Sequence, residues 1–329
     1  MIGERLESLV ADLTSSRTDK RNAAVSALFE AIEARQETDA LEKLAKMLEP
    51  MASGKLSWDR ALAIHAIGRV RLEQAVPLLE KHLGDPDSEV RAAVEDIAED
   101  IGEAGKPLLK KLVKDPDFGV RFWAAATLSE TGDAEGVEVL IEGMSTSGTR
   151  FEALQGLRRL GDRRGEPAAR KVLGKWFLAA IDRVAALGLL AAVGDPDAKK
   201  KLVEEIGKRR SDGRGLAMQI AGEIKLAEAV PVLEAIFRDR EDPHRGSAAM
   251  ALGEMKLEKF LPELTAMLLN DQETADLRGD VAWALHLNGT EPALAALREA
   301  GSKATGEELK KDLQHAIDET EKAGRAAPP

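Results

Sequence analysis

An arginine recurs about every 31 residues along most of this chain, and a similar pattern follows each copy. Small or apolar residues generally stand three, four and seven positions after the arginine, as Ala63, Ile64 and Ile67 do after Arg60. This spacing lays one apolar stripe along an α-helix. The nine copies are Arg21, Arg60, Arg91, Arg121, Arg150, Arg183, Arg214, Arg245 and Arg278. The sequence therefore predicts an array of similar units, each containing an amphipathic helix.

A second amphipathic segment lies between these helices. It reads "AVPLLEKHL" from Ala75 and "AVPVLEAIF" from Ala229, with a proline where the first helical turn is expected. Proline suits that position because its missing N–H has no partner there. A glycine often follows the arginine helix, as at Gly68, Gly222 and Gly253, and is expected to end it in a left-handed conformation. With no alternating strand pattern, we predict an all-α fold of about ten helix pairs.

A turn phrase links the two helices of a unit. It reads "DPDSEVRAAV" from Asp85 and "DPDFGVRFWA" from Asp115. These units resemble the HEAT repeat family, particularly the short bacterial form found in phycobilisome lyases. The resemblance covers nearly the whole chain and implies a right-handed α-α superhelix, a solenoid whose second helices line the concave side. We expect one solenoid over residues 1–323 with terminal capping helices, and a disordered tail at residues 324–329.

The resemblance also implies a ladder of turn aspartates and helix arginines six residues apart. A turn aspartate can accept N–H bonds at the helix start, and an arginine fork can tie the turn to its neighbour. We interpret the ladder as structural, because residues present in most units hold units together. Its members are Asp85, Arg91, Asp115, Arg121, Asp239 and Arg245.

No catalytic or metal-binding motif stands out. The five histidines form no HxxH or His-Glu pattern, cysteine is absent, and no phosphate-binding loop occurs. We therefore expect no enzyme activity, no metal and no cofactor. Two enzymatic alternatives stay open from the resemblance, a phycobilin lyase and a HEAT-like DNA glycosylase. For the second, a basic stretch lies beside Trp176 and Asp182.

Charge and composition limit the partners. The net charge of −11 and the 3% aromatic content disfavour nucleic acid, and the charge also argues against general affinity for anionic lipid. No stretch approaches the roughly 20 apolar residues that span a bilayer, so we expect a cytoplasmic protein without membrane insertion. Residues 150–214, however, hold 16 Lys and Arg against 9 Asp and Glu, a net +7. This excess suggests a protein or peptide partner with an acidic segment.

The concave face is the expected binding surface. Positions one, five and eight after each arginine should lie there, since positions three, four and seven face the core. Phe122, Phe151 and Val184 share one such position in three consecutive units, which predicts an exposed apolar stripe. Glycines at these positions would let a partner backbone approach closely. They are Gly188, Gly215, Gly246 and Gly279. The residues predicted to bind the partner are Phe122, Phe151, Gln155, Arg158, Val184, Gln219, Met250 and Trp283. We expect an interaction scaffold or adaptor.

Overall fold

The computed structural model describes residues 5–35, 37–304 and 306–326, and these contain helices and turns without a strand. The all-α prediction is confirmed. The chain divides into two compact units, unit 1 from Met1 to Gly143 and unit 2 from Met144 to Pro329. The single solenoid expected over residues 1–323 stays a prediction.

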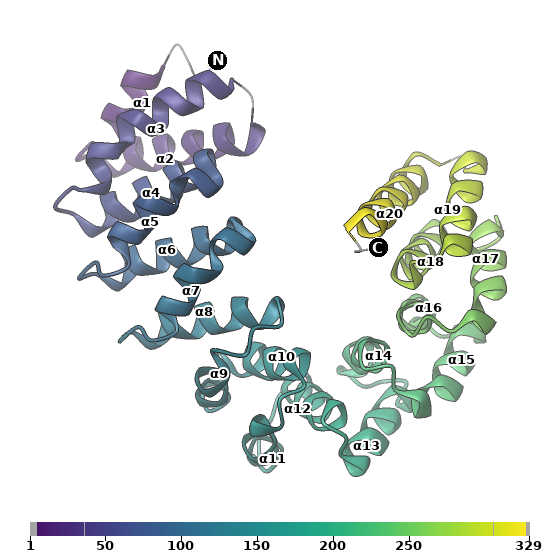
Figure 1. The fold of residues 1–329 in the computed structure, drawn as a ribbon. Helices are drawn as coiled ribbons and strands as arrows, with labels where there is room; N and C mark the ends of the chain where they lie inside the picture. Colours follow the sequence, from purple (N-terminus) through teal and green to yellow (C-terminus); the bar gives the residue numbers. More distant parts are fainter. Residues whose placement is uncertain (1–4, 36, 305, 327–329) are drawn as a thin grey trace. The chain divides into compact units, whose positions relative to one another are not determined.

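Unit 1 is a stack of helix pairs in which each pair packs on the next (Figure 1). Its helices are α1 (Leu6–Leu13), α2 (Thr18–Ala34), α3 (Thr38–Ala52), α4 (Ser57–Arg71), α5 (Val76–His82), α6 (Ser88–Asp100), α7 (Lys106–Leu112), α8 (Phe118–Glu130) and α9 (Val137–Gly143). Helices α2, α4, α6 and α8 carry the repeated arginines and pack side by side. The other helices form a second layer, so the apolar stripes lie between the layers.

Unit 2 continues the same scheme. Its helices are α10 (Arg150–Leu160), α11 (Glu166–Leu173), α12 (Ala180–Ala192), α13 (Pro196–Gly207), α14 (Arg214–Glu223), α15 (Val230–Arg238), α16 (Arg245–Glu254), α17 (Leu261–Leu269), α18 (Ala275–Asn288), α19 (Glu291–Lys303) and α20 (Glu307–Ala326). The even-numbered helices form the inner layer of this unit and the odd-numbered helices α11 to α19 the outer layer (Figure 1). A proline begins several outer helices, as expected.

The described helices form nine helix pairs within the two units, where the sequence predicts about ten. Helices α1 to α8 form four consecutive pairs and α11 to α20 form five. Helices α9 and α10 are consecutive in sequence but belong to different units. The predicted disordered tail begins too early, because α20 runs to Ala326. Residues 327–329 of that tail lie outside the described residues.

The predicted core stripe is confirmed. Ala124, Ala125 and Leu128 are fully buried in unit 1. The equivalent residues Ala248, Ala249 and Leu252 are fully buried in unit 2. Such small residues let neighbouring helices approach closely while the larger ones fill the remaining space. The burial of one stripe per helix explains why a single helix pair would not be stable alone.

The glycines expected at helix ends have a different role. Gly68, Gly222 and Gly253 lie inside helices α4, α14 and α16, and none has a positive φ. A Cβ on Gly253 would lie 2.1 Å from the backbone oxygen of Ala284 on α18. The missing side chain therefore permits the close approach of adjacent inner helices.

This contact gives a stability prediction. Gly253→Ala should lower the free energy of unfolding by about 1–3 kcal/mol, because the added methyl group forces α16 away from α18. Gly215→Ala is the matched control, since a Cβ there meets no atom within 4 Å. That variant should be neutral or gain up to about 1 kcal/mol from helix propensity. Chemical denaturation followed by circular dichroism measures both, and a stabilised Gly253→Ala protein would contradict the packing argument.

Candidate functional site

The ladder arginines join each repeat to the turn of the following one. In unit 1, Nε and Nη2 of Arg91 donate to Asp115 at 2.6 and 2.8 Å, and both side chains are buried. The guanidinium also donates to the backbone oxygen of Asp85 at 2.7 Å. Equivalent pairs are Arg60–Asp85 in unit 1, and Arg150–Asp182, Arg214–Asp242 and Arg245–Glu273 in unit 2.

The two aspartates of the turn phrase have separate tasks. Asp115 accepts the backbone N–H of Asp117 at 2.8 Å, which shapes the turn. Asp117 then accepts the N–H of Val120 at 3.2 Å and caps α8. Burial favours the neutral acid, yet bonds from Arg60 and from the turn backbone hold the pKa of Asp85 below its usual value. The two aspartates of the phrase therefore serve to build the repeat.

The ladder prediction is wrong at Asp239. That side chain lies at the surface, 3.3 Å from Arg209. The buried partner of Arg214 is Asp242, three residues later, because here Asp-Pro stands directly before the helix start. Arg121 also departs from the pattern, since it bonds Glu142 at 2.9 Å instead of a turn aspartate. Arg245 belongs to the ladder, with Glu273 as its partner.

A cleft of about 360 Å³ opens on the inner layer of unit 2. It lies across α14, α16 and α18, and its volume is within the range of ligand-binding pockets. Gln219, Met250 and Trp283, which share the fifth position after the repeat arginine, meet in it as the register predicts. The complete lining is Gly215, Gln219, Glu223, Ser247, Met250, Ala251, Glu254, Trp283 and Leu287.

The apolar side of the cleft is held by aromatic stacking. The indole of Trp283 stacks on His315 of α20 with centroids 5.5 Å apart, and it lies 4.5 Å from His286. Nδ1 of His286 lies 3.0 Å from Oγ1 of Thr320, which fixes this ring. Burial lowers the pKa of His286, so the ring is neutral at pH 7. Trp283 is thus a rigid, half-buried wall that a ligand can contact without ordering it first.

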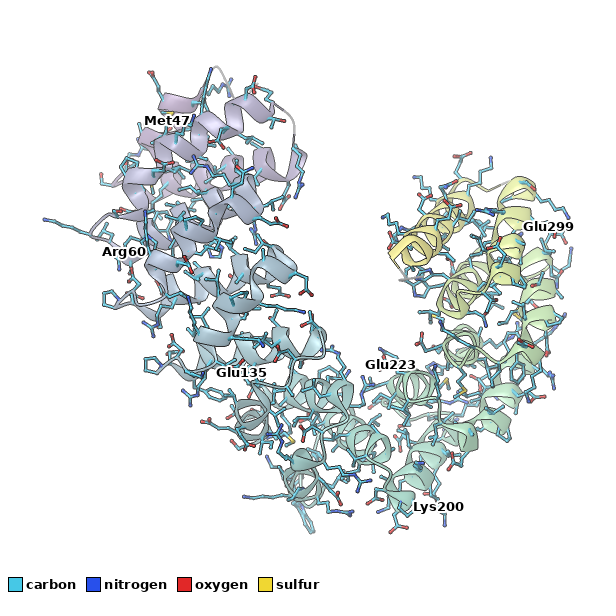
Figure 2. The ribbon with its side chains drawn as sticks, viewed as in Figure 1. Met47, Arg60, Glu135, Lys200, Glu223 and Glu299 are labelled. Carbon is cyan, nitrogen blue, oxygen red and sulfur yellow. The ribbon has the colours of Figure 1, made fainter. Side chains whose placement is uncertain are left out.

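Two carboxylates give the cleft a negative edge. Glu223 accepts from Nε2 of Gln219 at 2.8 Å and from the buried Arg158. None of the described residues forms an ion pair with Glu254, which is half-buried one repeat further on. Figure 2 places Glu223 on the inner layer of unit 2, opposite the Lys200 side. A positively charged group entering the cleft would meet Glu254 and the face of Trp283 together.

A neighbouring carboxylate adds to this negative character. Asp280 lies on α18, and a Cβ on Gly246 would be 1.8 Å from its Oδ2, so the carboxyl group covers that glycine. Burial, together with the charges of Asp276 and Asp312, raises the pKa of Asp280. Glu223, Glu254 and Asp280 therefore bring carboxyl groups to this part of the inner layer. The sequence argument instead placed the cation Arg158 in the groove and expected an acidic partner at residues 150–214.

The predicted apolar stripe is wrong at two of its three members. Phe122 and Val184 are fully buried, and Phe151 is half-buried. Phe122 packs against Phe118 at 5.7 Å, while a Cβ on Gly213 would lie 2.6 Å from Val184. The first position after the arginine thus packs against neighbouring side chains and turns.

Gln155 and Arg158 are also buried, against the prediction. Nε of Arg158 donates to Oε1 of Gln155 at 3.2 Å, and its other end pairs with Glu223 two repeats away. The arginine reaches that far by crossing Gly188, where a Cβ would lie 3.3 Å from its Cδ. A Cβ there would also lie 2.8 Å from the side chain of Ile220, so Gly188 makes room for internal contacts and not for a partner backbone.

Sequence reasoning missed the ninth position after the arginine. Glu223, Glu254 and Leu287 occupy it on α14, α16 and α18, and all three line the cleft. They stand four residues after Gln219 and its equivalents, one helical turn along the same face. The prediction used the eighth position, where Gly222 and Gly253 are buried. An i, i+4 pattern starting from the fifth position would have identified them.

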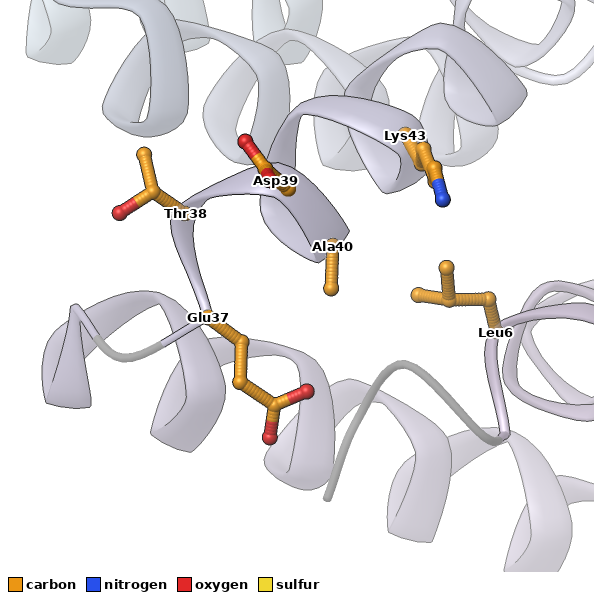
Figure 3. A pocket seen from close by; sticks show the side chains of 6 residues that line it. All are labelled: Leu6, Glu37, Thr38, Asp39, Ala40 and Lys43. Carbon is orange, nitrogen blue, oxygen red and sulfur yellow. The ribbon is translucent and has the colours of Figure 1, made fainter.

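A second hollow, of about 450 Å³, lies in unit 1 between α1 and the start of α3 (Figure 3). Four of its six lining side chains are exposed, and it contains no aromatic ring or buried polar group that could orient a ligand. Its lining is Leu6, Glu37, Thr38, Asp39, Ala40 and Lys43. The cleft in unit 2 is the better candidate site.

In the described part of the chain, the His, Asp and Glu side chains form no group of three that could hold a metal ion. None of its helices combines the length and apolar character needed to cross a membrane.

Comparisons with known proteins show what this chain is similar to. A family model of HEAT repeats matches residues 91–158 and 200–286. No curated protein matches the chain in sequence. Similar solved structures include an engineered protein, 19% identical over 96% of this chain and 98% of that one, with a TM-score of 0.48. Human deoxyhypusine hydroxylase is 20% identical over 76% and 97%, with a TM-score of 0.33. The CpcE–CpcF complex of phycocyanin lyase from Nostoc is 17% identical over 65% and 94%, with a TM-score of 0.40.

Proposed function

We propose that this chain, in which a family model of HEAT repeats matches residues 91–158 and 200–286, is a non-enzymatic scaffold that holds a protein segment on the inner layer of unit 2. The cleft across α14, α16 and α18 carries this proposal. Side chains at one repeat position converge there from three successive helices. A partner running along the inner layer would meet the same kind of position in each repeat.

The chemistry of the cleft selects the occupant. Met250, Trp283 and Leu287 offer apolar surface, and Glu254 offers a carboxylate beside them. A segment with a Lys or Arg next to a large apolar side chain satisfies both, because the cation can contact Glu254 and the indole face. The acidic partner expected from the net charge of residues 150–214 fits this cleft poorly. We therefore propose a basic, apolar peptide segment as its ligand.

Two observations favour a scaffold over an enzyme. Asp182, the acid considered for a glycosylase, is buried and bonded to Arg150 of the ladder at 2.8 Å. The carboxylates at the cleft stand beside an aromatic wall, without a histidine lining the cavity to act with them as an acid–base pair. A binding role needs only the surface that these residues already provide.

Charge reversal in the cleft tests the proposal. Calorimetric titration with a panel of short peptides that pair Lys or Arg with Leu or Phe should detect binding to the native protein. Glu254→Arg should weaken that binding at least about tenfold, because it replaces an attraction of about 1.4 kcal/mol or more by repulsion. Glu258→Arg is the matched control, since Glu258 is exposed and does not line the cleft. Equal binding by both variants would contradict this site, and so would selective binding of Glu-containing peptides.

A further inference from the structure

The turn between α11 and α12 carries the most exposed large apolar side chains of the described residues. Trp176 and Phe177 are adjacent in sequence, and their exposed fractions are 91% and 90%. Their rings contact only edge to face, with centroids 6.3 Å apart. Ile181, the second residue of α12, is 49% exposed. We call these three residues the aromatic turn. Exposed aromatic pairs of this kind lower the solubility of a protein. They therefore mark a surface that a membrane or another molecule covers.

Cations flank the aromatic turn in the sequence. Lys175 directly precedes it, and Arg183 follows it in the first turn of α12. A shallow hollow of about 580 Å³ lies beside Arg183 and continues into the next turn of the repeat array. Its lining is Arg183, Glu205, Lys208, Arg209, Arg210 and Ser211.

The positive charge of this surface is only partly neutralised. Glu205 is buried and forms ion pairs with Arg183 and Lys208, each at 3.0 Å. Neither Lys175 nor Arg210 forms an ion pair with any of the described residues. The net charge of −11 for the whole chain therefore misleads here, because attraction to a charged surface acts only over a Debye length of about 8–10 Å.

We propose that the aromatic turn attaches unit 2 to an anionic membrane surface. Trp176 and Phe177 would enter the interfacial region, where aromatic side chains concentrate, while Lys175 and Arg210 contact acidic headgroups. Peripheral attachment of this kind combines a short apolar insertion with a basic patch and needs no spanning helix. The nearly complete exposure of both rings favours a membrane over a protein partner. These rings have no hollow of their own chain around them, so a protein would have to supply the whole pocket.

The other exposed tryptophans differ from the aromatic turn. Trp123 is 47% exposed and lies on α8 against Phe122, at 5.3 Å. Trp58 is 39% exposed and is covered by the guanidinium of Arg21 at 5.0 Å. Both rings rest on their own chain. They therefore serve as internal controls for a general effect of exposed indole groups.

Vesicle binding tests the proposal with the full-length protein. The wild-type protein should co-sediment with phosphatidylcholine vesicles that contain about one third phosphatidylserine, and far less with pure phosphatidylcholine. Trp176→Ser with Phe177→Ser should weaken binding at least about tenfold, and Lys175→Glu with Arg210→Glu should do the same. Trp123→Ser should bind like the wild type. Circular dichroism should show unchanged melting for all variants, because the replaced side chains are at the surface.

Two results would overturn the membrane assignment. The first is a wild-type protein that stays in the supernatant with the phosphatidylserine vesicles. The second is vesicle binding that the aromatic double variant retains in full. If polyglutamate binds the wild-type protein and the vesicles do not, the aromatic turn docks an acidic protein, and the membrane proposal is wrong.

Discussion

Replacing Arg214 with Met is expected to lower the free energy of unfolding by about 3–5 kcal/mol, because it leaves a buried carboxylate without its partner. Arg214 is 2% exposed and donates to both oxygens of Asp242 at 2.8 Å. Its Nε also donates to the backbone oxygen of Ile206 at 2.8 Å. The substitution therefore removes three bonds that join the inner helix α14 to the end of α13 and to the turn before α16.

The loss should depend on the charge of Asp242. Burial opposes its ionisation, but Arg214 and the N–H of His244 together hold the pKa of Asp242 below its usual value. This depressed pKa stabilises the fold above the unfolded pKa of about 3.9, and the contribution disappears as the pH falls through the folded pKa. Adding Asp242→Asn to Arg214→Met should restore part of the lost stability, because no buried charge then remains.

An exposed ion pair provides the control for this experiment. Arg238 bonds Glu263 at 2.7 and 2.8 Å, but its side chain is about half exposed. Arg238→Met should cost at most about 1 kcal/mol. Urea denaturation at pH 7 compares the three variants. Similar losses for Arg214→Met and Arg238→Met would contradict the view that the buried ladder holds the repeats together.

Glu95→Gln is expected to stabilise the protein at pH 8 and to leave it nearly unchanged at pH 4. Glu95 is 4% exposed on α6 and accepts a hydrogen bond from Thr127 at 3.2 Å. Burial, followed by the charges of Asp96 and Glu99, raises the pKa of Glu95 to about 8. Glu95 stands four positions after Arg91. The residues at the same position in the adjacent repeats, Ile64 and Ala125, belong to the core.

The sign of the pH dependence follows from this raised pKa. Between about pH 4.5 and pH 8 the unfolded chain ionises Glu95 while the folded chain keeps its proton. Stability therefore falls as the pH rises through that range, by up to about 1.4 kcal/mol per pH unit from this residue. Gln cannot titrate, so the variant should lose this slope and be more stable at pH 8 by about 4–5 kcal/mol at most.

Denaturation at several pH values between 4 and 8 measures the effect. Glu103→Gln is the control, because Glu103 is exposed at the end of the same repeat. That variant should retain the wild-type slope. A Glu95→Gln protein with an unchanged slope would mean that Glu95 is ionised in the folded state.

The repeat pattern made most of the fold predictable, because core stripes depend on spacing along one helix. Ala124, Ala125 and Leu128 are buried as the period requires. The turn phrase also predicted caps and ion pairs, since these form between residues close in sequence or one repeat apart. The exception, Asp239, arose because one turn places its Asp-Pro three residues later, and an interval alone does not reveal that change.

The binding surface was harder to predict, because exposure depends on the distance between neighbouring helices. Gln219 and Met250 line the cleft as expected, whereas Val184, predicted for the same surface, is covered by the turn containing Gly213. Small residues such as Gly188 bring adjacent elements close enough to bury side chains at the edge of the stripe. That closeness is a property of two elements together, so a pattern read along one helix does not contain it.

Hydrogen exchange measured by mass spectrometry tests the central claim most directly, namely that partners bind in the inner-layer cleft of unit 2. A saturating basic, apolar peptide should slow exchange in residues 215–223, 247–254 and 283–287, on α14, α16 and α18. The outer helices α13 and α15 should exchange as before. Protection confined to the outer helices or to unit 1, with none on α14, α16 and α18, would contradict the proposed site.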